Sequence, residues 1–260
     1  MAVPSPTLPP ATTTNCWLLG HAAVVAVDPA GVAPQDQAGL VAALDGRSVQ
    51  AIFLTHHHGD HVGGARDLQS QTGAPILAHP HTAAKVQFPV DRLIDEGDVL
   101  QTDAGCWTAL LTPGHARGHL CLRSEDGDTI VAGDMLAGEG TIVLDPPEGD
   151  LAAYLSSLAR LAALEPSRLL PSHGAVIEPA LPMLEHYVAH RHARTRQIRL
   201  ALEACGSARP LELVAAVYPD LPLAFHPVAG RQVLCHLLWL ADQGAVGSSG
   251  DTFFSHGGAA

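Results

Sequence analysis

Seven residues in the first quarter of the chain set its architecture, and they read Thr55-His56-His57-His58-Gly59-Asp60-His61. The preceding residues 51–54, Ala-Ile-Phe-Leu, form a short apolar run that predicts a buried strand. The stretch has the pattern H-x-H-x-D-H, and imidazole nitrogens and carboxylate oxygens are ligands that Zn²⁺ takes at roughly 2.0 to 2.2 Å. Gly59 is expected to let the chain turn sharply. His56 and His58 would then face one place, and Asp60 and His61 another.

Three later residues of ligand type also follow apolar runs. They are His115 after residues 107–111, Asp134 after residues 129–132, and His173 shortly after residues 168–170. Each pattern predicts a strand that ends in a ligand loop, which is where open sheets place their sites. A solvated histidine-rich loop would not need these partners, so the set favours a metal site. Seven ligand-type residues exceed what one tetrahedral zinc uses, which favours a dinuclear site.

This order of motifs resembles the metallo-β-lactamase superfamily over residues 15–178. The resemblance implies ligands for a first zinc at His56, His58 and His115. It implies ligands for a second zinc at Asp60, His61 and His173, with Asp134 as a bridging carboxylate. It further implies that the two zinc ions share a hydroxide and that Asp60, as the catalytic residue, orients it. Manganese or iron can occupy similar sets of histidine and carboxylate ligands.

The order of predicted elements indicates an α/β fold. Strands and helices alternate with antiparallel hairpins as far as residue 185, which is typical of two facing sheets with helices outside, and 260 residues suffice for a sizeable core. The resemblance implies the four-layer αββα metallo-β-lactamase sandwich. We expect an extended lead-in at residues 1–14, the metallo-β-lactamase domain at 15–185, a small helical, winged-helix-like domain at 186–246, and a disordered tail at 247–260.

The motif that begins Gly133-Asp134-Met135 and the helical module after residue 185 resemble the beta-lactamase-like protein 2 family more narrowly. Activities known in that family include single-stranded RNA endonucleases and thioesterases that act on fungal polyketides bound to acyl carriers. Ser172 departs from the family, which more often has glycine there, and we expect only a local effect on the loop.

Charge helps to choose between these activities. Residues 1–185 carry 8 Lys/Arg against 21 Asp/Glu, whereas residues 186–246 carry 6 against 4. The one basic cluster consists of Arg191, Arg194, Arg196 and Arg199. At about 100° per residue it forms a collar around a helix and not the stripe typical of a nucleic-acid footprint. We therefore favour hydrolysis of a small-molecule or acyl-carrier-bound ester, thioester or lactone over a single-strand endoribonuclease. A non-catalytic nucleic-acid-binding regulator fits the complete ligand set least well.

Other histidines and the cysteines are expected to lie outside the site. His79 and His81 have a spacing that suits a ligand pair, but the seven residues above already fill the site. His57 should point away from its neighbours, and His119 resembles a family histidine that supports the ligand loop without binding metal. The five cysteines include no C-x-x-C pair and indicate neither disulfides nor a thiolate zinc site.

No feature of the sequence predicts membrane insertion or export. The first residues have no basic and apolar signal-peptide pattern, and no apolar run approaches the roughly 18 to 20 residues that span a bilayer. A cytoplasmic protein without a membrane partner is therefore expected. The sequence gives no indication of its oligomeric state.

Overall fold

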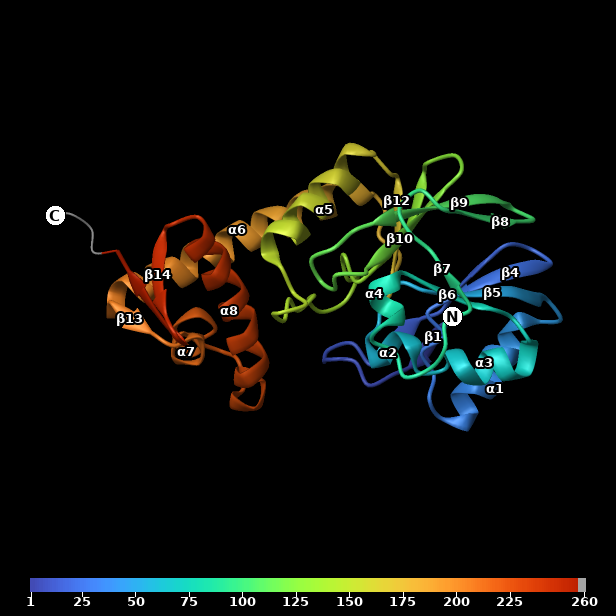
Figure 1. Ribbon diagram of the computed structural model, residues 1–260, viewed down its shortest axis with the longest axis horizontal. Helices are drawn as coiled ribbons and strands as arrows, with labels where there is room; N and C mark the ends of the chain where they lie inside the picture. Colours follow the sequence, from blue (N-terminus) through green and yellow to red (C-terminus); the bar gives the residue numbers. More distant parts are fainter. Residues whose placement is uncertain (257–260) are drawn as a thin grey trace.

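The computed structural model describes residues 1–256, and the larger part of the fold is built around two facing five-stranded sheets (Figure 1). The first sheet has the order β3 (Trp17–Leu19), β4 (Ala23–Val27), β5 (Ser48–Leu54), β6 (Ile76–Ala78) and β7 (Arg92–Leu93). The second has the order β12 (Arg168–Pro171), β11 (Thr129–Gly133), β10 (Leu120–Ser124), β9 (Gly105–Leu111) and β8 (Val99–Thr102). Strands β4 to β7 run parallel, as do β11 and β12, and the remaining neighbours are antiparallel.

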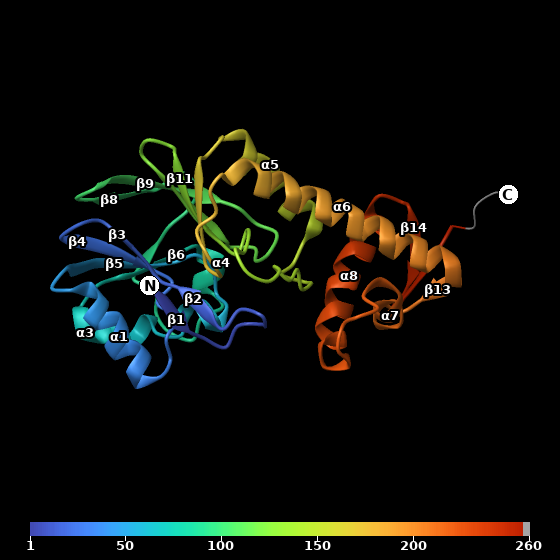
Figure 2. The same ribbon diagram turned by 180° about the vertical axis from the view of Figure 1, so that it is seen from behind.

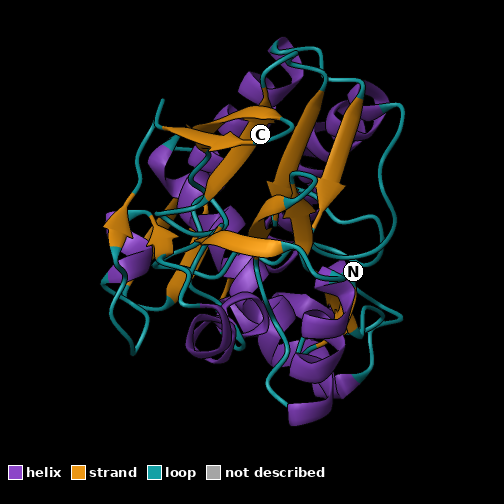
Figure 3. Cartoon of the chain, turned by 90° about the vertical axis from the view of Figure 1, so that its right-hand side faces the viewer, coloured by secondary structure: helices purple, strands orange, loops and turns teal. Residues whose placement is uncertain are grey.

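Helices cover the outer face of each sheet, which confirms the predicted αββα sandwich (Figure 3). The helices are α1 (Pro34–Leu44), α2 (Gly59–Val62), α3 (Ala65–Thr72), α4 (Pro80–Ala83), α5 (Leu151–Ala163) and α6 (Ala180–Cys205). Helices α1 and α3 pack on the first sheet, and α5 and α6 pack on the second. The alternation in β4 illustrates the principle, because Val24 and Ala26 face the helices while Val25 and Val27 enter the core between the sheets.

The N-terminal residues form structure of their own. In the segment expected to be an extended lead-in, β1 (Ala2–Pro4) pairs antiparallel with β2 (Thr13–Asn15). The Asn15 side chain donates to the carbonyl oxygens of Pro171 and Gly174 at 3.0 and 2.8 Å. These hydrogen bonds hold the N-terminal segment against the loop that carries His173.

Helix α6 continues from the sandwich into a second module (Figure 2). The boundary expected between residues 185 and 186 thus falls inside one helix. The remaining elements of the module are β13 (Ser207–Ala208), η1 (Pro210–Leu213), α7 (Val214–Val217), η2 (Leu223–Phe225), α8 (His226–Asp242), β14 (Val246–Ser249) and β15 (Thr252–Ser255). Helices that carry a three-stranded sheet, in the order β13-β15-β14, form a winged helix.

The disordered tail expected from residue 247 is wrong as far as residue 255. Strands β14 and β15 form a hairpin there, and β15 also pairs with β13. Phe253 is buried in the core of the module with Val246, and Gly247 lies directly under the ring of Phe254. The Gly-Ser-Gly run that suggested a disordered tail belongs to this hairpin, with residues 247–249 in β14 and Gly250 in the turn. Residues 257–260 of the expected tail lie outside the described residues.

None of the helices within residues 1–256 combines the length and the apolar character that a bilayer crossing requires.

The winged-helix module should lose stability in acid through His236. Its Nδ1 lies 2.7 Å from Thr195 Oγ1, and its Nε2 is buried without a partner. Burial, followed by the charges of Arg191 and Arg194, lowers the pKa of His236 to about 3. Below about pH 6.5 the unfolded chain therefore binds a proton that the folded module excludes, and stability falls as pH falls.

We expect this histidine to contribute a slope of about 1.4 kcal/mol per pH unit between about pH 6 and 4. Urea unfolding of His236→Gln over this range should give a shallower decline than the parent protein. His192→Gln, a change at an exposed position of α6, serves as the control. Parallel declines for the parent protein and His236→Gln would contradict the assignment.

Candidate metal centre

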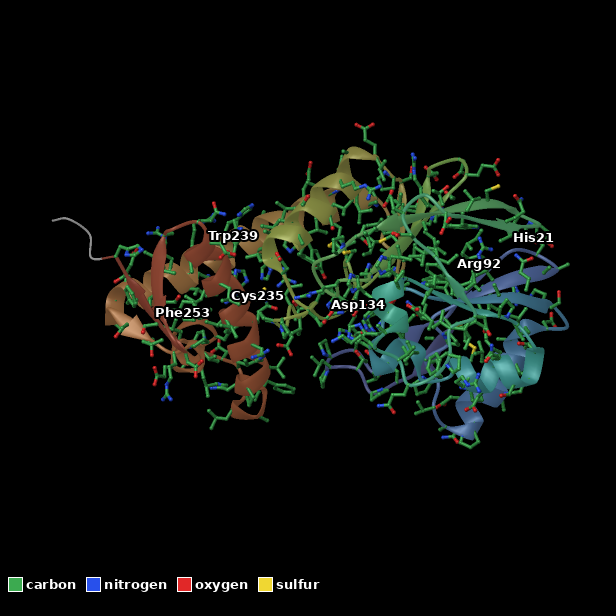
Figure 4. The ribbon with its side chains drawn as sticks, viewed as in Figure 1. His21, Arg92, Asp134, Cys235, Trp239 and Phe253 are labelled. Atoms are coloured by element: carbon green, nitrogen blue, oxygen red, sulfur yellow. The ribbon has the colours of Figure 1, made fainter. Side chains whose placement is uncertain are left out.

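The ligand-type side chains meet at the carboxyl ends of strands from both sheets. His56 follows β5, His115 follows β9, Asp134 follows β11, and His173 follows β12. Side chains that leave neighbouring strands at the same end of a sheet are held close together by the ladders behind them. Figure 4 shows Asp134 on the side of the sandwich that faces the winged-helix module, away from His21 and Arg92 at its far end.

The change of direction within the histidine-rich stretch comes from a helix. His58 is extended, with φ −66° and ψ 146°, and α2 begins at the next residue. Gly59 has no positive φ and lies in open space, so the glycine-dependent turn expected there is wrong. Because α2 starts at Gly59, Asp60 and His61 project differently from His56 and His58, as the pattern predicted.

Two groups of side chains result, and each could hold a metal ion. Within each group, the possible ligand atoms all lie within 4.8 Å of one another. The first group contains His56, His58, His115 and Asp134; the second contains Asp60, His61 and His173. This division is the one that the resemblance implied. All seven predicted residues are therefore brought together.

The outer ring nitrogens of two histidines are tied to protein oxygens that accept hydrogen bonds. His115 Nδ1 lies 2.8 Å from the Val143 carbonyl oxygen, and His173 Nδ1 lies 3.0 Å from that of Thr13. A carbonyl oxygen can only accept, so Nδ1 carries the proton in both rings. Nε2 of each ring is left as a lone pair that faces the site.

Asp28 fixes the tautomers of two further ligand-type histidines, His61 and His56. His61 Nδ1 lies 2.8 Å from Asp28 Oδ2, which also accepts the Thr55 hydroxyl at 2.7 Å. With its proton directed at Asp28, Thr55 Oγ1 can accept from His56 Nδ1 at 3.0 Å. His56 consequently directs an unprotonated Nε2 atom inward, and Nε2 is also the nitrogen of His61 that faces the site. Hydrogen bonds of this kind orient the histidine ligands of metal sites.

The histidine nitrogens that face the site lie too close together for hydrogen bonds among themselves to satisfy all of them. His115 Nε2 is 3.2 Å from His56 Nε2 and 2.9 Å from His58 Nδ1. Two lone pairs at this distance repel, whereas two atoms that bind one ion at about 2.1 Å lie roughly 3.4 Å apart. His61 Nε2 and Asp134 Oδ1 are buried without a hydrogen-bond partner. The donor set therefore fits metal cations.

The two oxygens of Asp134 face different groups. Oδ2 lies 3.4 Å from His115 Nε2, while Oδ1 lies 3.5 Å from both His61 Nε2 and His173 Nε2. One carboxylate between two clusters of nitrogen lone pairs has the placement that a bridging ligand requires.

His119 positions Asp134 from outside both groups. Its Nε2 accepts the backbone N–H of Asp134 at 3.0 Å, and its Nδ1 lies 2.9 Å from Thr112 Oγ1. Gly133 has φ +53°, and a Cβ there would collide with the His119 ring. The supporting role that the resemblance implied for His119 thus has a defined contact. Burial lowers the pKa of His119 to about 3, so its ring remains a neutral acceptor.

Electrostatics keep ligand atoms of the first group unprotonated. Burial lowers the pKa of His115 to about 3, and burial and the neighbouring His61 hold that of His56 well below its usual value. At His61 burial acts in the same direction, but Asp134 and Asp28 outweigh it and raise the pKa. A cation would compete with a proton at that ring, so metal binding there should release a proton.

Sequence reasoning missed Asp28, which was interpreted only as the end of a strand. It is fully buried directly after β4 and accepts hydrogen bonds from the ligand-type His61 and from Thr55, which precedes the histidine-rich stretch. A carboxylate after a buried strand was the signal that identified Asp134, and it could have identified Asp28. Ser172 Oγ lies 3.4 Å from Asp28 Oδ2, so the effect of Ser172 reaches beyond its own loop.

Replacing Asp28 by asparagine should weaken metal binding by roughly 10- to 100-fold, because an amide has only one acceptor oxygen. If that oxygen keeps the Thr55 hydroxyl and His61, the NH₂ group faces the Thr55 backbone N–H, which Asp28 Oδ1 accepts at 2.8 Å. Asparagine tolerates the left-handed backbone at this position, where φ is +50°. Competition with a chromogenic chelator measures the affinity, with Asp36→Asn on the surface of α1 as the control. An unchanged affinity would show that Asp28 has no part in holding the ligands.

The remaining histidines of the predicted region stay outside both groups. His79 Nδ1 instead accepts the backbone N–H of His81 at 3.1 Å, and His79 Nε2 lies 3.5 Å from Asp95. The expectation that His57, His79 and His81 are not part of the cluster is in keeping with this geometry.

A cavity of about 300 Å³ opens beside the ligand groups. The ligand-type residues His58, Asp60, His115, Asp134 and His173 line its floor. The N-terminal segment at residues 6–11, the loop at 139–145 and Val228 of α8 form its walls. The winged-helix module thus takes part in enclosing the site.

An αββα sandwich whose strand ends carry clustered histidine and aspartate side chains is the architecture of a metal-dependent hydrolase. The chain belongs to the metallo-beta-lactamase superfamily, whose family model matches residues 9–173. A second model, the beta-lactamase associated winged helix domain, matches residues 210–255.

Comparisons with individual proteins agree with this family assignment. The chain is 34% identical to the lactamase-like protein vrtG of Penicillium aethiopicum, over 77% of this chain and 66% of that protein. It is 30% identical to the beta-lactamase-like protein 2 homolog of Drosophila melanogaster, over 76% of this chain and 70% of that protein, which confirms the narrower resemblance.

Two solved structures are similar in fold. A metallo-beta-lactamase family protein from Thermus thermophilus superposes with a TM-score of 0.83 and 26% identity, covering 98% of both chains. The protein TTHA1623, crystallised in a di-iron-bound form, has a TM-score of 0.56 and 31% identity, covering 67% of this chain and 94% of that one.

Proposed function

We propose that this hydrolase is a dinuclear zinc enzyme that cleaves a thioester, ester or lactone bond of a small-molecule or carrier-bound acyl substrate. The convergence of histidine nitrogens on both sides of Asp134 carries the proposal. His56, His58 and His115 would hold one ion, and Asp60, His61 and His173 the other, with Asp134 between them. The two bound ions would supply hydroxide at neutral pH by lowering the pKa of water from 15.7 towards 7.

The chain's own residues would prepare the reaction. Asp60 lines the cavity, and its Oδ2 lies 3.6 Å from His173 Nε2, so it can accept a proton from an attacking water while it helps to hold the second ion. Asp28 and the carbonyl oxygens of Thr13 and Val143 would keep the ligand rings oriented throughout the reaction.

Zinc is our proposal for the physiological metal, because histidine and carboxylate ligands suit it. The di-iron form of TTHA1623 supports iron as the alternative, and manganese can use the same ligands.

The charges around the cavity favour a substrate without a chain of phosphates. Four carboxylates line the cavity, those of Asp60, Asp134, Glu139 and Asp145, and its lining within residues 1–256 includes no lysine or arginine. The bound ions would neutralise Asp60 and Asp134, and Asp145 pairs with Arg231, so the preference rests on the lack of a lysine or arginine in the lining within residues 1–256 that could bind further phosphates.

Arginines of the predicted collar already have protein partners. Arg191 Nη2 donates to the Ile142 carbonyl oxygen at 2.6 Å, Arg194 Nη1 donates to that of Val217 at 2.7 Å, and Arg199 pairs with Glu203. This engagement weighs against the second candidate, a single-strand endoribonuclease. The ligand cluster weighs against a non-catalytic nucleic-acid-binding regulator.

A cytoplasmic location is part of the proposal. All five cysteines are free thiols, and three of them are buried. Free thiols are typical of proteins from reducing compartments.

A parallel assay on zinc-loaded protein tests the proposed function. Acyl thioesters and a fluorescent single-stranded RNA are offered separately, with Asp60→Ala as the inactive control. We expect thioester turnover that the Asp60 variant loses, and no metal-dependent RNA cleavage. RNA cleavage lost in the same variant, without thioester turnover, would replace the proposal by the endoribonuclease.

A further inference from the structure

A second cavity adjoins the metal cavity, and its walls are largely apolar. It has a volume of about 430 Å³, within the usual range for small-molecule pockets. Leu8, Thr141, Val143 and Val228 line both cavities, so the two cavities meet at these four residues, which we call the passage. Val143 also ties the passage to the metal site, because its carbonyl oxygen lies 2.8 Å from His115 Nδ1.

Three separate parts of the chain build this second cavity. Residues 8–10 of the N-terminal segment form one wall, and residues 141–143 of the sandwich form another. The winged-helix module supplies the rest, through Leu221, Pro222 and Phe225 and through Val228 and Ala229 at the start of α8. The cavity therefore exists only where the two modules meet.

Contacts between the modules hold these walls in place. Gln232 Oε1 of α8 accepts the backbone N–H of Leu144 at 2.8 Å, and Arg191 of α6 donates to the Ile142 carbonyl oxygen at 2.6 Å. Arg231 forms an ion pair with Asp145. The loop between the two cavities is thus fixed to the winged-helix module by three side chains.

The polar side chains of the lining are partly occupied by protein partners, although Arg191 Nε and Gln232 Nε2 are buried without a hydrogen-bond partner. The Arg194 guanidinium stacks 4.0 Å from the centre of the Tyr218 ring and donates to the Val217 carbonyl oxygen. His190 lies at the exposed rim of the cavity, and partial burial followed by Arg191 lowers its pKa, which leaves the ring neutral at pH 7. Arg191 and Arg194 thus place positive charge at one side of the cavity, and the rest of the lining is mainly aliphatic and aromatic.

We infer that the second cavity receives the apolar acyl chain of the substrate while its carbonyl carbon lies at the metal centre. This inference rests on the proposed function and names the substrate class as medium- or long-chain acyl thioesters or esters. It also assigns a role to the winged-helix module, which would serve as a wall of the acyl pocket instead of a nucleic-acid clamp.

Substitution at the passage tests the inference. Val228→Trp would fill the space that connects the cavities from α8. Leu8→Trp would do so from the N-terminal segment, where Leu8 is 46% exposed and a larger side chain leaves the core undisturbed. Leu223→Trp is the matched control, because Leu223 belongs to the same module, is 80% exposed and lines neither cavity.

The first readout is kcat/KM with acetyl, hexanoyl and decanoyl thioesters of N-acetylcysteamine. We expect the parent protein and Leu223→Trp to gain about fourfold for each methylene that the cavity buries. Both passage variants should lower the ratio of decanoyl to acetyl turnover by at least about tenfold. Equal ratios in all four proteins would overturn the inference and leave the proposed hydrolase intact.

The second readout is calorimetric binding of decanoate, with acetate as the probe that reaches only the metal site. Binding of decanoate at least about tenfold tighter than acetate, lost in both passage variants, supports the acyl pocket even where no thioester is turned over. That pattern would contradict the proposed reaction alone. Equal binding of decanoate and acetate to the parent protein would overturn the pocket.

Discussion

Alanine in place of Asp134 will reduce the bound metal from two ions per chain to one or none and lower hydrolysis by on the order of 10³ or more. Asp134 Oδ2 faces the first ligand group and Oδ1 faces the second. Its removal therefore takes a negatively charged ligand away from both metal positions. Metal analysis of gel-filtered protein gives the stoichiometry, and thioester turnover gives the activity.

Glu139→Ala is the matched control, because Glu139 lines the same cavity but belongs to neither ligand group. It should retain two ions and most of its turnover. A variant of Asp134 that keeps two tightly bound ions would refute the bridging assignment. Loss of metal in the Glu139 variant would show that general cavity charge, and not ligation, governs loading.

Asp60→Ala should lower kcat by on the order of 10³, with one metal ion retained and little change in thermal stability. Asp60 lies on α2 and lines the cavity, where its carboxylate faces other ligand-type side chains and not the apolar core, so its removal leaves the packing of the sandwich intact. The remaining ligands of the first group do not depend on it. Steady-state kinetics, metal analysis and thermal unfolding together separate these effects.

His57→Ala, three positions before Asp60 in the sequence, is the control for the Asp60→Ala variant. His57 stands between two ligand-type histidines in the sequence but belongs to neither group. The variant should keep both ions and its turnover. A loss equal to that of Asp60→Ala would mean that the histidine-rich stretch acts as a whole and that the division into ligands and bystanders is wrong.

The ligand-type residues could be predicted because their chemistry and their position agree. His115 and Asp134 follow apolar runs that could only be buried strands, and strand ends of one sheet meet in space. The division of the seven residues between two ions could not be predicted in the same way. It depends on α2, a four-residue helix whose start at Gly59 no apolar periodicity reveals.

The supporting residues were harder to predict because their partners are distant in sequence. Asp28 contacts His61 across 33 positions, and Thr13 contacts His173 across 160. Only the packed sandwich brings these pairs together, so local patterns carry no sign of them. The loop at residues 139–145 is a similar case, since side chains of α6 and α8 fix its conformation.

The hairpin of β14 and β15 shows that amino-acid composition alone does not predict whether a segment is ordered. The Gly-Ser-Gly run at residues 247–250 suggested a disordered tail, but residues 246–249 pair with a strand that contains the aromatic residues Phe253 and Phe254. Phe253 contributes apolar burial that outweighs the entropy of ordering a glycine-rich turn. A pair of aromatic residues after a Gly-containing turn was the available signal.

The central claim is that two metal ions at this site create a hydrolase. Metal-free protein titrated with zinc, with bound metal and thioester turnover measured at each point, tests it most directly. We predict that turnover rises only as the second ion binds and reaches its maximum at two ions per chain. Full turnover with one ion, or none with two ions bound, would contradict the account.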